Sequence, residues 1–316
     1  MSDQEMLDSK DGLGEKRNGN SSSEKNSPKK DKSGKKRIGI KKKIGIAILV
    51  LFLVTLPGYF LGLTVRTYEV RDERILGSLR IALVTDLHSC KYGEGQKELL
   101  TKIEEQKPDV ILLGGDIFDD KLSDVRTEEF LAGISGKYPC YYVTGNHEAW
   151  AGGNAYRMKM EILKKYDITK LSGDSVLLET GSGTVRLCGV DDPDIILVQA
   201  ANSFETEFAG LRESISEEEF TILLTHRPEM IERYAKAGFD LVLAGHAHGG
   251  QVRIPGIMNG FYAPNQGLFP KYAGGRYDLD GMTMIVSRGL ARESTFFPRF
   301  CNAPELVIID LSGKGN

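Results

Sequence analysis

Two histidines close together at the end of an apolar run are the most chemically informative feature of this sequence. The segment reads LVLAGHAHGGQ over residues 241–251, and its first four residues are typical of a buried strand. The glycines that follow permit a sharp turn, so His246 and His248 can enter one crevice, whereas a continuing strand would send neighbouring side chains to alternate faces. Taken alone, the segment fits either a turn with two surface imidazoles or a pair of metal ligands.

Similar polar clusters follow several other apolar runs. They comprise Asp86 and His88 in DLH, Asp116, Asp119 and Asp120 in GGDIFDD, Asn146, His147 and Glu148 in GNHE, and His226 in TH. The chain has five histidines, and every one of them lies just beyond a predicted strand. Histidines that served only in a core or on a surface would be scattered over helices and other regions as well. The distribution therefore favours a shared functional site.

Strand ends of an open α/β sheet form one crevice, so these groups can converge from distant parts of the chain. Their imidazole, carboxylate and carboxamide groups, without a thiolate, suit borderline to hard divalent ions such as Mn, Fe or Zn. The ligands suffice for two ions, and a carboxylate between two metal sites can bridge them. We expect Asp116 to take that bridging position.

Short apolar strands mixed with helices must position these clusters. Strands are predicted at residues 80–85, 109–113, 140–144, 175–179, 184–190, 221–225, 241–244, 283–287 and 305–311, and helices at 96–106 and near 124–134. This mixture indicates a layered α/β domain. We expect Pro255 to Asp280, rich in Gly, Pro and Tyr, to form a long loop over the site. We expect GVDDPD, residues 189–194, to form an Asp-Pro turn with solvated carboxylates, with binding of a metal or substrate by Asp191, Asp192 and Asp194 as the alternative.

The N-terminal part of the chain divides into a tail, an apolar segment and a linker. Residues 1–43 are rich in Ser, Gly, Asn, Lys and Glu and nearly empty of aromatics, so we predict a disordered basic tail. Residues 44–65 contain no charged residue and would span about 33 Å as a helix, which matches a bilayer hydrocarbon thickness of roughly 30 Å. We predict one transmembrane helix there, a linker at 66–79 and one folded domain at 80–312.

The apolar segment is interpreted as a signal anchor. A cleaved signal peptide is the alternative, but the preceding tail is long and no A-x-A site follows. Lys41, Lys42 and Lys43 precede the segment and a flank of mixed charge follows it, so we expect a cytoplasmic N-terminus and an extracytoplasmic folded domain on the cell membrane. Gly58 and Gly62 have the GxxxG spacing that can support a weak homodimer, with lipid-facing glycines as the alternative.

The charge of the chain bears on nucleic-acid binding, and the spacing of its cysteines bears on metal binding and disulfides. The chain carries a formal charge of −3, but residues 1–43 hold 13 Lys and Arg against 7 Asp and Glu, so the remainder is near −9. An acidic domain lacks the cationic surface that nucleic-acid backbones require, so we expect no nucleic-acid partner. Cys90, Cys140, Cys188 and Cys301 show no CxxC spacing and are interpreted as ordinary thiols, with a disulfide as the alternative.

The motifs together resemble a known family. The ordered set DLH, GD followed by Asp119, GNHE, TH and GHAH closely resembles the calcineurin-like metallophosphoesterases. The extension GHAHGGQVRIP, with the later VSRGL and PRFCNAPEL, looks like the membrane-associated bacterial branch of that superfamily. The resemblance covers residues 80–311. Each block is common by itself, but five blocks in this order are highly specific.

The resemblance implies a fold and a role for each site residue. The implied fold is a sandwich of two β-sheets flanked by helices. One metal ion would be held by Asp86, His88, Asp116 and His248, and the other by Asp116, Asn146, His226 and His246. His147 would lie beside the ions without binding them, would be oriented by Asp119, and would act as general acid to the leaving oxygen or help to hold the phosphate.

The implied activity is that of a membrane-anchored dinuclear phosphoesterase, which would hydrolyse a phosphodiester, phosphomonoester or pyrophosphate bond, with diesters preferred over monoesters. Two cations would bind the phosphoryl oxygens and lower the pKa of a bridging water. The substrate would be a phosphate ester linked to lipid or to the cell envelope, and Arg227, Arg253 or Arg288 would be available to clamp its phosphate. The alternatives are a noncatalytic metal-binding module and a membrane scaffold.

Overall fold

The computed structural model describes residues 39–55, 58, 61–199, 203–292 and 298–313. The chain divides into two units, residues 1–49 and 50–316. Helix α1 (Ile40–Thr55) has 16 residues. Among the residues that the structure describes, none of the helices combines the length and the apolar character that crossing a membrane requires. Most of the predicted tail and residues 56–57 and 59–60 of the predicted transmembrane segment lie outside the described residues.

The predicted linker at 66–79 is wrong. Strand β1 (Thr64–Arg71) begins inside the predicted transmembrane segment and pairs in parallel with β14 (Glu305–Ser312), and β2 (Ser78–Val84) begins before the predicted linker ends. Strand β1 lies at the edge of its sheet, and its charged Arg66, Glu69 and Arg71 are exposed. These charges give an edge strand the composition of a linker.

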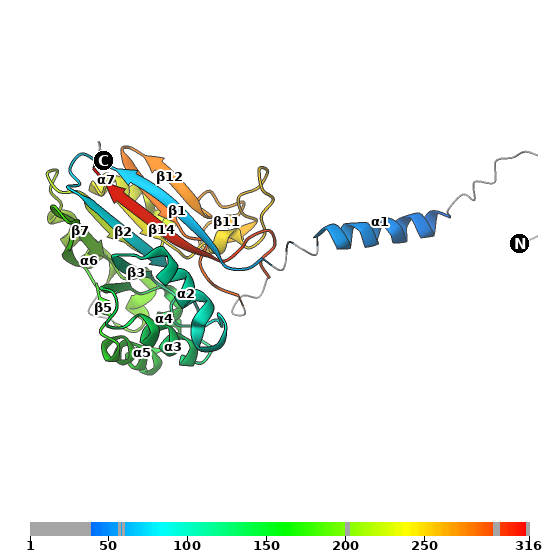
Figure 1. The fold of residues 1–316 in the computed structure, drawn as a ribbon, viewed down its shortest axis with the longest axis horizontal. Helices are drawn as coiled ribbons and strands as arrows, with labels where there is room; N and C mark the ends of the chain where they lie inside the picture. Colours follow the sequence, from blue (N-terminus) through cyan, green and yellow to red (C-terminus); the bar gives the residue numbers. More distant parts are fainter. Residues whose placement is uncertain (1–38, 56–57, 59–60, 200–202, 293–297, 314–316) are drawn as a thin grey trace, which may run out of the picture. The chain divides into compact units, whose positions relative to one another are not determined.

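Two six-stranded mixed sheets form the centre of the second unit (Figure 1). The first has the order β1, β14, β2, β3 (Val110–Gly114), β4 (Cys140–Val143) and β5 (Thr169–Lys170). The second has the order β12 (Gly275–Leu279), β13 (Met282–Val286), β9 (Leu241–Ala244), β8 (Thr221–Leu224), β7 (Thr184–Gly189) and β6 (Asp174–Glu179). Strands β2, β3 and β4 run parallel to one another, as do β7, β8 and β9.

Helices cover the outer face of each sheet. Helices α2 (Lys97–Gln106), α3 (Val125–Ile134) and α5 (Gly153–Lys165) share one apolar cluster with the outer face of the first sheet. Helices α6 (Phe204–Glu213) and α7 (Ile231–Ala237) share another with the outer face of the second sheet. A third cluster lies between the sheets. The unit is therefore a two-sheet sandwich flanked by helices, and the α/β prediction is confirmed.

The central strands read as continuous apolar runs because both of their faces are buried. In β2, Ile81 and Leu83 pack between the sheets, while Ala82 and Val84 pack against the helices. The same alternation occurs in β9, where Leu243 faces the other sheet and Val242 faces the helices. Side chains that alternate between two buried faces must all be apolar, so periodicity alone does not reveal the two faces.

The segment from Pro255 to Asp280 is only partly the long loop that we predicted. It contains the small antiparallel pair β10 (Tyr262–Ala263) and β11 (Gly267–Leu268), and it ends with β12. The short elements near the strand ends are α4 (Asn146–Trp150) and the 3-10 helices η2 (Glu94–Gln96), η3 (Pro193–Leu197), η4 (Pro228–Met230) and η5 (His248–Gly250).

Candidate metal centre

The carboxyl ends of five strands meet at one edge of the sandwich and carry the predicted ligands. In the first sheet, β2 is followed by Asp86 and His88, β3 by Asp116, and β4 by Asn146. In the second sheet, β8 is followed by His226, and β9 by His246 and His248. The two edges are in direct contact, because His226 Nδ1 lies 2.8 Å from the carbonyl oxygen of Gly114 at the end of β3. Gly115 makes this approach possible, since a Cβ there would lie 2.5 Å from His226 Nδ1.

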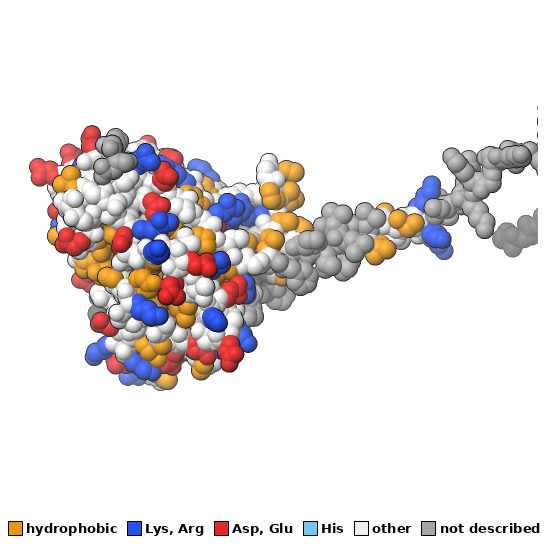
Figure 2. Space-filling view, in the orientation of Figure 1, with side chains coloured by type: hydrophobic (Ala, Val, Ile, Leu, Met, Phe, Trp, Pro, Cys, Tyr) orange, Lys and Arg blue, Asp and Glu red, His pale blue; other side chains and the backbone are white. Residues whose placement is uncertain are grey.

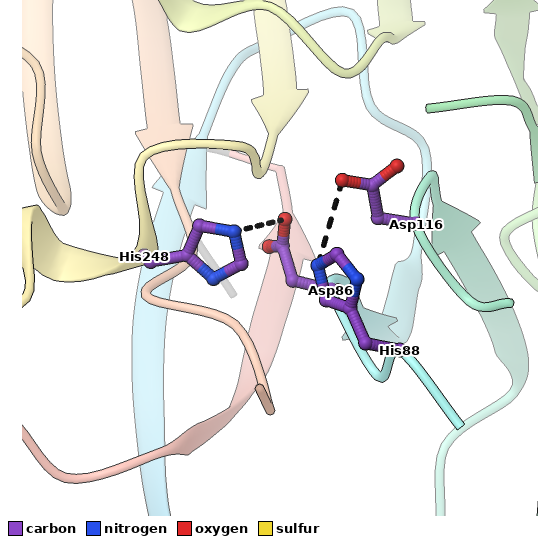
Figure 3. A group of neighbouring side chains, drawn as sticks. All are labelled: Asp86, His88, Asp116 and His248. Carbon is purple, nitrogen blue, oxygen red and sulfur yellow. Dashed lines mark ion pairs between the residues drawn. The ribbon is translucent and has the colours of Figure 1, made fainter. Parts of the chain in front are cut away.

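A first group of candidate ligands comprises Asp86, His88, Asp116 and His248, and all four side chains are buried. Each offers one ligand atom, and these atoms lie within 4.8 Å of one another. Figure 3 shows the imidazole of His88 facing Asp116 and that of His248 facing Asp86. The Nε2 atoms of these histidines lie 3.5 Å from Asp116 Oδ2 and 3.9 Å from Asp86 Oδ1.

A second buried group comprises Asp116, His226 and His246, again with ligand atoms within 4.8 Å of one another. His226 Nε2 lies 3.1 Å from Asp116 Oδ2. Asn146 directly precedes His147, whose backbone N–H donates a 2.9 Å hydrogen bond to Asp116 Oδ1. Asp116 thus belongs to both groups, which is the arrangement that a bridging carboxylate requires.

Buried atoms without a hydrogen-bond partner indicate that these residues fit metal ions. Among the described residues, such atoms occur on six of the seven predicted ligands: Asp86 Oδ2, His88 Nε2, Asp116 Oδ2, Asn146 Oδ1, His226 Nε2 and His248 Nδ1. Asp116 Oδ2 and His226 Nε2 form an ion pair at 3.1 Å but no hydrogen bond with each other. Native proteins rarely leave buried polar atoms unpaired, because each costs roughly 1–3 kcal/mol. An ion that binds these atoms would remove the cost. His88 and His226 each engage Nδ1 in a hydrogen bond, to Asp119 and Gly114, which leaves Nε2 for a metal.

The cluster is electrostatically coupled. Burial alone would raise the pKa of the Asp116 carboxyl, but the neighbouring His226 and His88 hold it well below its usual range. Burial would lower the pKa of His226, yet the charge of Asp116 raises it to about 10. Burial and the nearby His226 depress the pKa of His246, which favours the neutral imidazole that binds a metal.

The backbone is unusual at most of the candidate ligands. Five of them adopt positive φ angles: Asp86 (52°), His88 (48°), Asp116 (51°), His246 (67°) and His248 (47°). Residues other than glycine adopt this region uncommonly, although Asp and His do so more often than most. Such conformations cluster at functional sites, where the surrounding structure holds them. Here they allow side chains two residues apart, such as Asp86 and His88, to belong to one group of candidate ligands.

His147 lies beside the centre, but its hydrogen-bond partner differs from the expected one. Its Nδ1 atom lies 2.7 Å from Asp120 Oδ1 and 3.6 Å from Asp119 Oδ2. Asp119 instead lies 3.1 Å from His88 Nδ1 and accepts the backbone N–H groups of Lys121 and Leu122. The expectation that Asp119 orients His147 therefore stays a prediction: Asp119 forms an ion pair with His147, but Asp120 lies closer to the imidazole.

Glu148 is a positioning residue that the sequence reasoning missed. Its carboxylate is fully buried and accepts backbone N–H groups from Gly145, Asp116 and Phe118 at 2.7, 3.1 and 2.9 Å. It therefore ties the turn after β4 to the turn after β3. Burial, and secondly the charge of Asp116, raise its pKa to about 7. Its position in the GNHE motif was the available signal.

Arg227, one of the three arginines predicted to be available to the phosphate, lies beside His246. Its Nη1 atom is 3.2 Å from His246 Nε2, and its guanidinium forms a buried two-point ion pair with Asp192. Asn265 Oδ1, in the segment between β10 and β11, accepts from Arg227 Nη1 at 2.7 Å and lies 2.9 Å from His246 Nε2. The expected turn at GVDDPD is present, because Asp192 caps η3, but the expected solvation is wrong for Asp191 and Asp192, which are buried.

Comparisons with known proteins agree with this geometry. A family model described as calcineurin-like phosphoesterase matches residues 79–250, more than half of the chain. An uncharacterized metallophosphoesterase of Campylobacter jejuni is 28% identical to this chain, and the match covers 79% of this chain and 63% of the relative. An uncharacterized metallophosphoesterase of Aquifex aeolicus is also 28% identical, and the match covers 82% of this chain and 94% of the relative. Phosphodiesterase YaeI of Escherichia coli is 26% identical, and the match covers 81% of this chain and 89% of the relative. The chain thus spans less than two thirds of the Campylobacter relative.

Proposed function

We propose that this chain, which belongs to the calcineurin-like phosphoesterase family, is a metal-dependent phosphodiesterase with a dinuclear centre. The observation that carries the proposal is the set of buried, unpartnered ligand atoms on two groups of residues that share Asp116. A single bridging carboxylate between two ligand groups is the arrangement of two-metal hydrolytic sites. The name of the Escherichia coli relative supports a diester over a monoester.

Each candidate ligand has a place in this proposal. Asp86, His88, Asp116 and His248 would hold one divalent ion, and Asp116, Asn146, His226 and His246 the other. Mn, Fe and Zn all suit these imidazole and oxygen donors. When bound, such ions supply Lewis acidity toward phosphoryl oxygens and lower the pKa of bound water. Asp119 would keep Nε2 of His88 directed at the centre by holding its Nδ1 atom.

His147 is suited to protonate the leaving oxygen. Its side chain is 19% exposed, whereas the other site histidines are nearly enclosed, so it can meet a substrate at the mouth of the site. Asp120 Oδ1 accepts a hydrogen bond from the Nδ1–H group of His147, which leaves Nε2 to carry the transferred proton. General acid catalysis of this kind typically contributes about 10²- to 10⁴-fold. Arg227, held by Asp192, would contribute positive charge beside His246.

Membrane attachment through residues 44–63 is part of the proposal, since Thr64 and Val65 of the predicted span belong to β1. The support is the sequence itself, which carries no charge over these 20 residues and follows three lysines. The tail would then be cytoplasmic and the catalytic unit extracytoplasmic, since positive residues remain on the cytoplasmic side. Protease added to intact cells whose wall has been removed should degrade the catalytic unit. Protection of that unit would contradict this topology.

The test of function is hydrolysis by the purified full chain. The protein would be stripped with a chelator, reloaded with Mn, Fe or Zn, and assayed on bis-p-nitrophenyl phosphate and p-nitrophenyl phosphate. We expect about two ions per chain, metal-dependent turnover, and faster hydrolysis of the diester. His248→Ala should abolish turnover, whereas Met158→Ala, at an exposed position on α5, should not. Two bound ions without turnover of either ester would instead indicate a noncatalytic metal-binding module.

A further inference from the structure

An exposed apolar surface lies next to the candidate metal centre. Six large apolar side chains between residues 254 and 269 are 42–83% exposed, and we call them the apolar rim: Ile254, Ile257, Phe261, Tyr262, Leu268 and Phe269. Figure 2 shows hydrophobic side chains on the part of the unit that projects in this region. Single exposed apolar residues are ordinary, but a group of this size within 16 residues marks an interaction surface.

The rim is held in place. Backbone hydrogen bonds join Ile254 and Met258, and Tyr262 pairs with Leu268 across β10 and β11. The rings of Phe261 and Phe269 pack edge to face with centroids 5.8 Å apart, yet the two residues remain 44% and 65% exposed. The apolar side chains are therefore presented to the outside by an ordered backbone, which removes part of the entropy cost of binding.

Two contacts connect the rim directly to the metal centre. The backbone N–H of Phe261 donates a 2.9 Å hydrogen bond to the carbonyl oxygen of Gly250, two residues after His248. Asn265, between β10 and β11, lies 2.9 Å from His246 Nε2. A molecule or surface that binds the rim would therefore lie at the edge of the candidate metal centre.

A contact of Gly58 inside the second unit indicates what covers the apolar rim. The carbonyl oxygen of Gly58, inside the uncharged run 44–65, accepts the backbone N–H of Cys301 at 2.8 Å. The adjacent Phe300 pairs with Val252 and accepts the N–H of Arg253, directly before the rim begins. Within the second unit, Gly58 of the uncharged run therefore lies beside the residues that directly precede the rim.

The charge of the region fits the same occupant. Residues 253–275 contain Arg253 and Lys271 and no Asp or Glu, although the chain after residue 43 carries a net charge near −9. Apolar side chains among cationic ones suit the interface of an anionic bilayer, where the former enter the acyl boundary and the latter meet lipid phosphates. A protein partner would not require Gly58 of the uncharged run to lie at this point.

We propose that the apolar rim docks on an anionic phospholipid bilayer and that the adjoining centre acts on phosphoesters of amphiphilic molecules held in that bilayer. The second part rests on the proposed phosphoesterase function, whereas docking does not. The rim would sit at the membrane surface and bring the headgroup of a membrane-resident ester to the ligand groups that Asn265 and Gly250 adjoin. Soluble esters would reach the centre without the rim.

Docking is tested by fluorescence of the full chain in vesicles of phosphatidylcholine and phosphatidylglycerol. Phe269→Trp places a reporter in the rim, and Leu177→Trp places one at an exposed position of β6, at the opposite edge of the second sheet from β12. The chain has one natural tryptophan, Trp150, whose signal is subtracted with the parent protein. Brominated lipids should quench the Phe269→Trp signal at least twofold and leave the Leu177→Trp signal unchanged. Equal or absent quenching at both positions would overturn the proposal.

The substrate class is tested with two esters that share a leaving group: soluble bis-p-nitrophenyl phosphate and vesicle-borne phosphatidyl-p-nitrophenol. The variant Ile257→Asp/Leu268→Asp/Phe269→Asp should keep soluble turnover within twofold and lose at least tenfold on the vesicle-borne ester. The control Met158→Asp/Leu177→Asp, which alters exposed apolar positions elsewhere, should keep both activities.

The outcomes separate the two proposals. Soluble turnover with no hydrolysis of the vesicle-borne ester, or with equal losses in rim and control variants, would overturn the amphiphile inference and leave the phosphodiesterase standing. Loss of a dimer in the rim variant, without lipid quenching in Phe269→Trp, would assign the rim to a second copy of the chain and overturn docking. Quenching without turnover of either ester would contradict the phosphodiesterase function alone.

Discussion

The backbone N–H of His246 donates a 2.9 Å hydrogen bond to Asp86 Oδ1, which joins residues 160 positions apart in the chain. Asp86 follows β2 of the first sheet, and His246 follows β9 of the second. One carboxylate therefore holds the two sheet edges together through Oδ1, while its buried Oδ2 has no hydrogen-bond partner. Assembly of the sandwich and assembly of the metal centre depend on the same side chain.

This dual role makes Asp86→Asn informative. The asparagine oxygen can still accept the His246 N–H, so the fold should persist, but the neutral amide is a weaker metal ligand. We expect circular dichroism and thermal unfolding close to those of the parent, metal content reduced by about one ion per chain, and hydrolysis lowered at least about 100-fold. Elemental analysis by mass spectrometry measures the ions. Asp280→Asn, in the exposed turn between β12 and β13, is the control, and full metal content in Asp86→Asn would contradict the ligand assignment.

Asp119 and Asp120 are neighbours in sequence with different contacts, so their amide variants should differ. Asp120→Asn weakens the hydrogen bond to His147 Nδ1 and should lower kcat about 10-fold or more on esters whose leaving group needs a proton, with little effect on p-nitrophenyl esters. Asp119→Asn acts through His88 and should reduce metal affinity about 10- to 100-fold.

Leaving-group dependence and metal titration, measured on both variants, distinguish these roles. Metal affinity should stay within twofold of the parent in Asp120→Asn. If the leaving-group effect appears in Asp119→Asn instead, then Asp119 orients His147 in solution and the hydrogen bond to Asp120 is not the working one.

The central strands and the ligand positions were predictable because each corresponds to a pattern in a short stretch of the sequence. Strands buried on both faces read as short apolar runs, and in this chain the histidines cluster just after such runs. The choice between Asp119 and Asp120 as partner of His147 was not predictable, since two adjacent carboxylates differ only in the direction that the turn gives them. The pairing of Arg227 with Asp192 joins separate loops after β8 and β7, and no local pattern records it. Edge strand β1 was missed because its exposed charges resemble a linker.

Glu148 should matter for both stability and metal binding. In Glu148→Ala, three buried backbone N–H groups lose their acceptor, which should destabilise the protein by about 2–4 kcal/mol and loosen the turn that carries Asp116. Glu148→Gln keeps one acceptor oxygen and should lose less. Urea unfolding and metal titration of both variants measure the two effects, with Glu161→Ala on α5 as the control. Unchanged metal affinity in Glu148→Ala would show that the turn after β3 does not depend on this carboxylate.

Glu207 offers a test of pH-dependent stability away from the metal ligands. Its side chain is 5% exposed, Oε2 accepts the Asp191 N–H at 2.8 Å, and Oε1 has no hydrogen-bond partner. Burial, and secondly the charge of Asp191, raise its pKa from 4.5 to about 7. The folded state therefore binds this proton more tightly than the unfolded state does. The resulting stabilisation is complete below about pH 4.5 and is lost as the pH rises through about 7.

Glu207→Gln should remove this dependence, because the amide keeps the shape and stays neutral. Relative to the parent, the variant should gain up to about 3 kcal/mol in unfolding free energy between pH 4.5 and pH 8. Urea unfolding at several pH values, with a chelator present to exclude metal effects, measures the difference. Glu218→Gln, at an exposed position, should show no such trend. A constant difference between Glu207→Gln and the parent across this range would mean that Glu207 ionises in the folded protein as readily as it does in the unfolded chain.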